Sequence, residues 1–210
     1  MELKLDRVDP LDNAPYFTRT IVDLGNTFEP VALARFKAVS KEIGIGSNGF
    51  VPGMTPHSDF DWFTGTPDYI LEAPDGKKCI VELKTHWYPS PEDAEPMQNM
   101  IKKHWLQVQA YLEILNIDLG YLFSWTIENG YTLFSIQRAR DFWATVIWPQ
   151  VMLFRDAFES GREVWPEYRN DILSQLNFRS GEKRSLCESV TCEMDKTTTQ
   201  IEITQTLDSI

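Results

Sequence analysis

The pattern of apolar and polar positions along the chain predicts three helices. The first spans about residues 26–42, with Pro30 near its first turn. The second runs from about residue 97 to 115, and the third from about 139 to 159, where Pro149 should kink or divide it. The apolar residues that share one face of the second helix are Ile101, Trp105, Val108, Leu112 and Leu115.

Short apolar runs on either side of Asp75-Gly76 and of Asn129-Gly130 predict two β-hairpins. The first hairpin lies within DFDWFTGTPDYILEAPDGKKCIVELKT, and YLFSWT and YTLFSI form the second. The order of helix, strands, helix, hairpin and helix favours an α/β fold with a mixed central sheet flanked by helices.

The remaining segments carry turn and loop signals. Residues 1–24 are interrupted by prolines and predict irregular structure, and IGIGSNGFVPGMTPHSD, residues 43–59, reads as a long loop. We expect one domain over residues 1–180, with its core at about 25–160. Residues 181–210 form a polar tail in which the alternation of TQIEITQTL, residues 199–207, is typical of one added strand, although partial disorder is the alternative.

Composition narrows the function classes. The net charge of −11 argues against a protein that coats nucleic acid nonspecifically, because affinity for phosphates comes largely from Lys and Arg. It allows a nuclease, since metal-binding carboxylates carry negative charge and a local basic patch can still guide DNA. No stretch approaches the roughly 18 to 20 apolar residues of a membrane span. The basic candidates are Lys77, Lys78, Lys102, Lys103, Arg138 and Arg140.

The three cysteines of the chain fall in no recognisable metal-ligand spacing. We expect Cys187 and Cys192 to be free thiols in a reducing compartment.

Three ionisable residues stand out near the first hairpin. Glu82 and Lys84 in VELKT are two residues apart, so a strand places both side chains on one face. Asp68 begins the preceding strand, and the turn brings it close enough to share a divalent ion with Glu82. An ion pair on an exposed hairpin would give the same Glu-x-Lys pattern. The apolar flank CIVEL instead favours a central strand, where unpaired charge is costly.

Strand register sets a condition on this site. A regular two-residue turn at Asp75-Gly76 would pair Asp68 with Leu83 and leave Asp68 on the face opposite to Glu82. We therefore expect an odd-length loop or a β-bulge in this hairpin.

The second helix adds further candidates. Gln107 and Tyr111 in QVQAY are four residues apart and share a face, where Gln107 could orient water and Tyr111 could reach a phosphate. His104 lies on nearly the same face, and Lys102 and Lys103 precede it as candidates for contact with nucleic acid. The edge of an amphipathic helix with no chemical role would carry the same residues.

Together, GTPDYI, VELKT and QVQAY resemble the three motifs of PD-(D/E)xK nucleases. More narrowly, they resemble the phage lambda exonuclease and YqaJ-like viral recombinase family. GNTFEPVALARF is similar to the upstream helix of that family, in which a glycine precedes a metal-site glutamate, here Glu29. An acid in the first turn of a helix is also favoured by the helix dipole. The resemblance spans about residues 25–160 and implies a restriction-endonuclease-like core.

The resemblance implies Mg²⁺ or Mn²⁺ held by Asp68, Glu82 and the main-chain carbonyl of Leu83, with the upstream glutamate close by. Lys84 would position the attacking water or help to deprotonate it, and Gln107 would support that arrangement. The iron-sulfur branch of the family has four cysteines, whereas this chain has 3.

The activity implied by the resemblance is hydrolysis of DNA phosphodiester bonds, by an exonuclease that resects duplex ends in recombination or repair. Its implied partners are duplex or single-stranded DNA, a single-strand annealing protein and further copies of the chain. The implied location is intracellular, cytoplasmic or nuclear, for a virus- or phage-encoded enzyme. Two alternatives stay open: an endonuclease on DNA or RNA with the same fold, and a nucleic-acid-binding module with a degenerate site.

Overall fold

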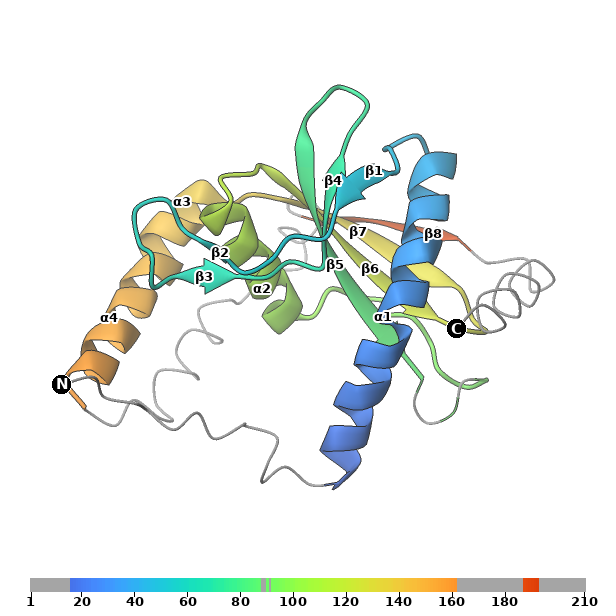
Figure 1. The fold of residues 1–210 in the computed structure, drawn as a ribbon, viewed down its shortest axis with the longest axis horizontal. Coiled ribbons are helices and arrows are strands. Elements are labelled where there is room, and N and C mark those ends of the chain that lie inside the picture. Colours follow the sequence, from blue (N-terminus) through green and yellow to red (C-terminus); the bar gives the residue numbers. More distant parts are fainter. Residues whose placement is uncertain (1–15, 88–89, 91, 162–186, 193–210) are drawn as a thin grey trace.

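The computed structural model describes residues 16–87, 90, 92–161 and 187–192, and its centre is a six-stranded mixed sheet (Figure 1). The order across the sheet is β1-β4-β5-β6-β7-β8, and each neighbouring pair is antiparallel except β5 and β6. The strands are β1 (Asn48–Phe50), β4 (Tyr69–Glu72), β5 (Lys78–His86), β6 (Leu119–Thr126), β7 (Tyr131–Gln137) and β8 (Cys187–Cys192). A separate small sheet pairs β2 (Thr55–Pro56) with β3 (Thr64–Gly65).

Helices cover both faces of the large sheet (Figure 1). The helical elements are α1 (Tyr16–Glu42), α2 (Lys102–Ile114), α3 (Arg140–Phe142), the π-helix η1 (Trp143–Ile147) and α4 (Trp148–Glu159). One core forms where α1 meets the sheet, around Phe36, Leu71 and Phe123. The other forms under α2 and η1, around Ile80, Trp105 and Leu122. The predicted mixed α/β architecture with flanking helices is therefore confirmed.

The hairpin of β4 and β5 has the odd-length loop that the sequence predicts. Tyr69 pairs with Val81 and Glu72 with Lys78, and the N–H of Ala73 donates to the carbonyl of Lys77 at 2.8 Å. The loop between these last two residues is Pro74-Asp75-Gly76, in which Gly76 has φ 81° and so takes the left-handed conformation of a three-residue hairpin loop. Continued by one residue, the register sets Asp68 opposite Glu82.

The first helix is longer than predicted, and the second begins later than predicted. α1 begins at Tyr16 rather than near residue 26, so Pro30 lies inside the helix and residues 16–24 are not irregular. Packing of Ala32, Phe36 and Val39 on the sheet outweighs the backbone hydrogen bond that Pro30 cannot make. α2 begins at Lys102 rather than near residue 97.

The segment expected to be a long loop contains β1 and β2. A Cβ atom at Gly49 in β1 would lie 2.0 Å from the carbonyl oxygen of Ile70, so glycine is required there by the close approach of β4. β8 lies within the expected polar tail and adds an unpredicted strand to β7. The strand predicted over residues 199–207 lies outside the described residues.

The third predicted helix is divided, as expected, but ahead of Pro149. Residues 143–147 form the π-helix η1 between α3 and α4, and Pro149 occupies the first turn of α4. A proline lacks the N–H for an i→i−4 bond and crowds that carbonyl, and a π-turn accommodates the mismatch. Within the described ranges, no helix combines the length and the apolar character needed to cross a membrane.

Candidate metal centre

Asp68, Glu82 and Lys84 meet where β4 begins beside the middle of β5. Asp68 immediately precedes β4, and its Oδ2 accepts the backbone N–H of Leu83 at 2.7 Å. Glu82 and Lys84 share the face of β5 that also carries Ile80, which packs under α2. The structure thus brings the three predicted residues together on one face of the sheet, where β4 begins.

Pro67 affects the hydrogen bonding of the Leu83 carbonyl. The hydrogen-bonded pair of Ala73 and Lys77 fixes the alternation along the hairpin, and its next positions are Leu71 with Cys79 and Tyr69 with Val81. Continued past the start of β4, the same alternation sets Pro67 opposite Leu83. A proline at this position has no N–H to donate, so the carbonyl of Leu83 receives no ladder bond from it. That carbonyl projects to the same side as the N–H that Asp68 accepts.

Glu82 is the most buried charged side chain of the site, at 2% exposure. Lys84 Nζ donates to Glu82 Oε1, while Glu82 Oε2 is buried without a hydrogen-bond partner among the described residues. Burial, followed by the charge of Asp68, raises the pKa of Glu82 to about 7. A buried carboxylate oxygen with no donor is costly unless a cation or proton meets it. The reading of this motif as an exposed hairpin ion pair is therefore wrong.

The pKa values of the other two acidic residues, Asp68 and Glu29, are also raised. Burial raises the pKa of Asp68, against the lowering effect of the Leu83 N–H. Burial and the charge of Asp68 also raise the pKa of Glu29 on α1, so these two carboxylates lie within electrostatic reach of one another. Glu29 stands inside α1 and not in its first turn, so the helix dipole does not account for it.

Two predicted residues of α2 face the site and contact each other. Gln107 Nε2 donates to the hydroxyl oxygen of Tyr111 at 3.0 Å. The pKa of Tyr111 is raised by burial, and the charges of Glu82 and Asp68 add to the effect. β3 holds the tyrosine ring in place, because a Cβ atom at Gly65 would lie 2.7 Å from its Cδ1.

Two histidines lie near Lys84. The pKa of His104 is lowered to about 4 by burial, and by the charges of Lys84 and Lys103. The pKa of His86 is also lowered, by burial and then by Lys84, and its Nε2 is buried with no hydrogen-bond partner among the described residues. Both rings are therefore neutral at pH 7. His86 was missed by the sequence reasoning, although it continues the two-residue spacing of Glu82 and Lys84 along β5.

Apart from Lys78, whose Nζ lies 5.6 Å from the centroid of the Phe50 ring, the basic candidates divide into two groups. Lys77, Arg138 and Arg140 are paired with acidic side chains at 2.7, 2.7 and 2.6 Å. They therefore offer no uncompensated positive patch. α2 begins with Lys102 and Lys103, which lie within one turn of His104. These two predicted nucleic-acid contacts therefore lie beside the site. Cys79 is buried and free, while the side chains of Cys187 and Cys192 lie outside the described part of the structure.

The residues present fit a divalent ion in part. Asp68 and Glu82 supply two carboxylates, and the unpartnered Oε2 of Glu82 together with the Leu83 carbonyl supplies hard oxygen ligands of the kind Mg²⁺ and Mn²⁺ prefer. Glu29 does not complete the set as it lies: the described residues form no group of three or more His, Cys, Asp or Glu side chains that could hold a metal ion. The fit therefore rests on two carboxylates and one carbonyl.

Comparison with known proteins adds no relative. No protein-family model matches the chain, and no curated protein is significantly similar to it. The resemblance to PD-(D/E)xK nucleases stays a prediction from the motifs.

Proposed function

We propose that this protein is a metal-dependent nuclease of the PD-(D/E)xK type, with a restriction-endonuclease-like core, that hydrolyses phosphodiester bonds in DNA. The observation that supports this most is the juxtaposition of Asp68 with the buried Glu82 and its partner Lys84, where β4 begins. A buried carboxylate oxygen without a donor, next to a second carboxylate, is expensive in a site without a function. Perturbed pKa values gather here, as they commonly do in catalytic sites.

In this proposal Asp68, Glu82 and the Leu83 carbonyl hold Mg²⁺ or Mn²⁺. When bound, such an ion lowers the pKa of a coordinated water and offsets the charge that develops on the phosphate. The hydrolysis adds water across one P–O bond: the hydroxyl joins phosphorus and a proton reaches the leaving oxygen.

The chain's own residues would orient the reactants. Lys84 places a positive charge beside Glu82, where it can attract the scissile phosphate and position the attacking water. The neutral rings of His86 and His104 can donate N–H groups to phosphate oxygens without adding charge. Gln107 orients Tyr111 through their hydrogen bond, so that its hydroxyl can meet the phosphate backbone.

Exonuclease action on duplex ends is the finer part of the proposal, and it comes from the motif resemblance. To test it, 5′-labelled linear duplex DNA, closed circular DNA and RNA are incubated with the protein and Mg²⁺ or Mn²⁺, beside a Glu82→Gln variant. We expect the linear duplex to be degraded and the circle to survive, with no activity in the variant. Nicking of the circle would assign an endonuclease. Equal cleavage by the variant would rule out the site.

A further inference from the structure

A cavity of about 380 Å³ lies at the C-terminal end of α2, away from the metal centre. It is open to solvent on one side and is lined by α2, by the loop before β3 and by the start of η1 and α4. This volume is within the range of small-molecule sites. The residues that the argument uses are His57, Phe60, Glu113, Asn116, Arg138 and Trp148. None of the residues around Asp68 and Glu82 lines it.

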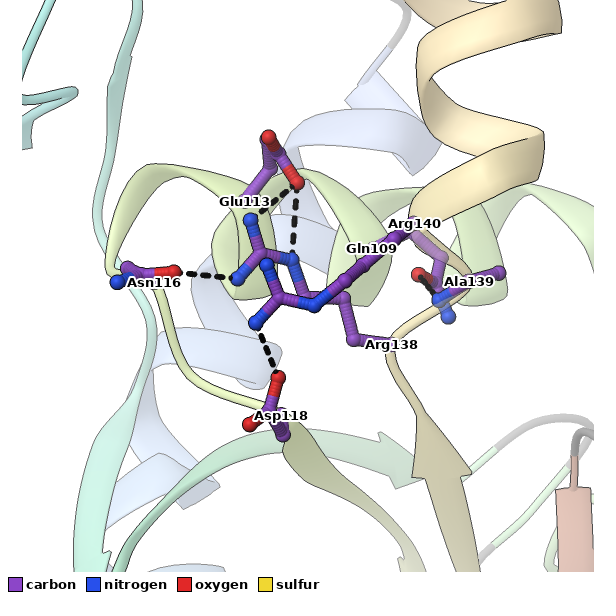
Figure 2. A network of polar contacts seen from close by, with 7 residues as sticks. All are labelled: Gln109, Glu113, Asn116, Asp118, Arg138, Ala139 and Arg140. Carbon is purple, nitrogen blue, oxygen red and sulfur yellow. Dashed lines mark hydrogen bonds and ion pairs between the residues drawn. The ribbon is translucent and has the colours of Figure 1, made fainter.

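One wall of the cavity is a polar network with unused hydrogen-bonding capacity. Arg138 donates from Nε and Nη2 to Glu113 Oε2 at 2.9 and 2.7 Å, and from Nη1 to Asn116 Oδ1 at 2.7 Å (Figure 2). Figure 2 shows the second carboxylate oxygen of Glu113 turned away from Arg138. Within the described residues, neither that Oε1 nor Nδ2 of Asn116 has a partner. The wall therefore presents an acceptor on Glu113 and a donor on Asn116, on different sides of the Arg138 guanidinium (Figure 2).

The conformation of the backbone and the burial of the side chains fix the positions of Glu113 and Asn116. Asn116 has φ 51°, and it is the one non-glycine residue with positive φ in the part of the chain that the structure describes. Arg138 is almost completely buried, with 6% of its side chain exposed, and Glu113 retains 21%. Gln109 supports the network from inside α2, since its Nε2 donates to the Gln137 carbonyl. Its Oε1 accepts the Ala139 N–H (Figure 2).

Another part of the lining is aromatic. The rings of Phe60 and Trp148 are 4.7 Å apart, and the ring of His57 lies within 25° of parallel to that of Trp148. Trp143 and Ala144 of the π-helix η1 also line the cavity. π-helical turns are frequently found at functional sites. A lining that combines aromatic rings with a free donor and a free acceptor suits a flat heterocycle with polar edges.

We propose that this cavity binds a nucleobase. Its ring would stack against the aromatic residues of the lining, a contact that any base can make. Its N–H edge would donate to Glu113 Oε1, and a ring nitrogen or carbonyl would accept from Asn116 Nδ2. The charge of Arg138 is already compensated by Glu113, and Asp59 also lines the cavity, so a phosphate has no free cation here. The base can belong to a free nucleotide or to a strand.

The inference does not depend on the proposed cleavage, because binding is measured with EDTA present. Nucleosides of each base, the corresponding mononucleotides, ribose 5-phosphate and short single-stranded oligonucleotides with or without one abasic position are titrated calorimetrically into the full chain. We expect at least one nucleoside to bind, and ribose 5-phosphate to bind at least about tenfold more weakly. Tighter binding of an oligonucleotide than of its nucleoside, lost at the abasic position, assigns the base to a strand. Equal or weaker oligonucleotide binding assigns it to a free nucleotide.

Two substitutions test whether the nucleobase binds in this cavity. Ala144→Leu narrows it, and Thr145→Leu adds similar bulk at the next exposed position, outside the lining. We expect Ala144→Leu to weaken binding at least about tenfold, and Thr145→Leu to leave it within about twofold. Equal affinities of both variants and the wild type would overturn the assignment. So would binding of ribose 5-phosphate as tight as that of the nucleotides, or no binding of any nucleoside or oligonucleotide.

Glu113→Gln separates recognition from support of the fold. A glutamine can still accept from Arg138 through one oxygen, but it presents an N–H donor in place of Glu113 Oε1. We expect the order of preference among the nucleosides to change in this variant. A uniform loss across all nucleosides, with the order unchanged, would mean that Glu113 only supports the fold and contacts no base.

Discussion

Asp68 bonds with its side chain to the backbone of Leu83 on the neighbouring strand, since its Oδ2 accepts the N–H of Leu83 at 2.7 Å. The carboxylate of Asp68 is thereby fixed beside Glu82, and the carbonyl of Leu83 is left without the ladder donor that any residue other than proline would provide. Backbone hydrogen bonding thus positions the Asp68 carboxylate and leaves the Leu83 carbonyl available. These are two of the three oxygen ligands that the proposed metal centre needs.

Replacing Pro67 tests this relationship. Pro67→Ala restores an N–H that can donate to the Leu83 carbonyl and extend the ladder. A hydrogen bond of about 1 kcal/mol competing with the ion should weaken Mn²⁺ binding roughly fivefold, as measured by isothermal titration calorimetry. Pro74→Ala, at the exposed tip of the same hairpin, is the matched control and should bind like the wild type. Wild-type affinity in both variants would show that the Leu83 carbonyl is not a ligand.

Glu82 should make the metal-free protein less stable as the pH rises. Its pKa is about 7 in the folded protein against 4.5 for an ordinary glutamate, so the folded state holds the proton more tightly. Its contribution to stability is full below about pH 4.5 and is lost as the pH rises through about 7. The difference corresponds to at most roughly 3 kcal/mol in the free energy of unfolding.

Chemical denaturation in EDTA between about pH 5 and pH 8 measures this loss. We expect Glu82→Gln to remove it, while Glu72→Gln, on an exposed position of the neighbouring strand, keeps the wild-type dependence on pH. Parallel curves for the wild type and Glu82→Gln would contradict the raised pKa. Addition of Mn²⁺ should restore wild-type stability most strongly at the higher pH, because the ion binds the ionised carboxylate.

Gly65 should be required for the position of Tyr111. An alanine Cβ there would lie 2.7 Å from Cδ1 of Tyr111 and 3.0 Å from Cδ1 of Ile114, so the ring must move. We expect Gly65→Ala to lower the free energy of unfolding by about 1–3 kcal/mol. Gly53→Ala, where no atom lies within 4 Å, should change it by less than about 0.5 kcal/mol.

A double-mutant cycle identifies the cause of this loss. In a Tyr111→Ala background the ring is absent, so the cost of Gly65→Ala should fall by at least about 0.5 kcal/mol. If the two costs simply add, the contact between Gly65 and Tyr111 does not determine the stability at this position.

The local part of the site could be predicted from the sequence because strand periodicity is local. The two-residue spacing of Glu82 and Lys84 fixes their common face, and the need to align Asp68 with them predicts the odd-length loop. The same spacing leads to His86, which would have been found by continuing it. Gln107 and Tyr111 follow in the same way from the helical repeat.

The remaining features depend on contacts between residues far apart in the sequence, so local patterns could not predict them. Pro30 and the glycines around β1 are residues that usually interrupt regular structure. Pro30 is tolerated because α1 packs on the sheet, and the glycines are needed because β4 passes close to them. β8 pairs with β7 across a wide separation in sequence, which no local pattern records. The pairing of Arg138 with Glu113, 25 residues apart, likewise hides a neutralised charge among the basic candidates.

The central claim is that Lys84, held beside Asp68 and Glu82, takes part in metal-dependent hydrolysis of phosphodiester bonds. The most direct measurement is the rate of Mn²⁺-dependent cleavage of linear duplex DNA by Lys84→Ala, beside Lys77→Ala, whose side chain is 82% exposed on the hairpin loop. We expect Lys84→Ala to lose at least about 100-fold in rate while remaining folded, and Lys77→Ala to stay within about twofold. Equal rates for Lys84→Ala and the wild type would contradict the claim.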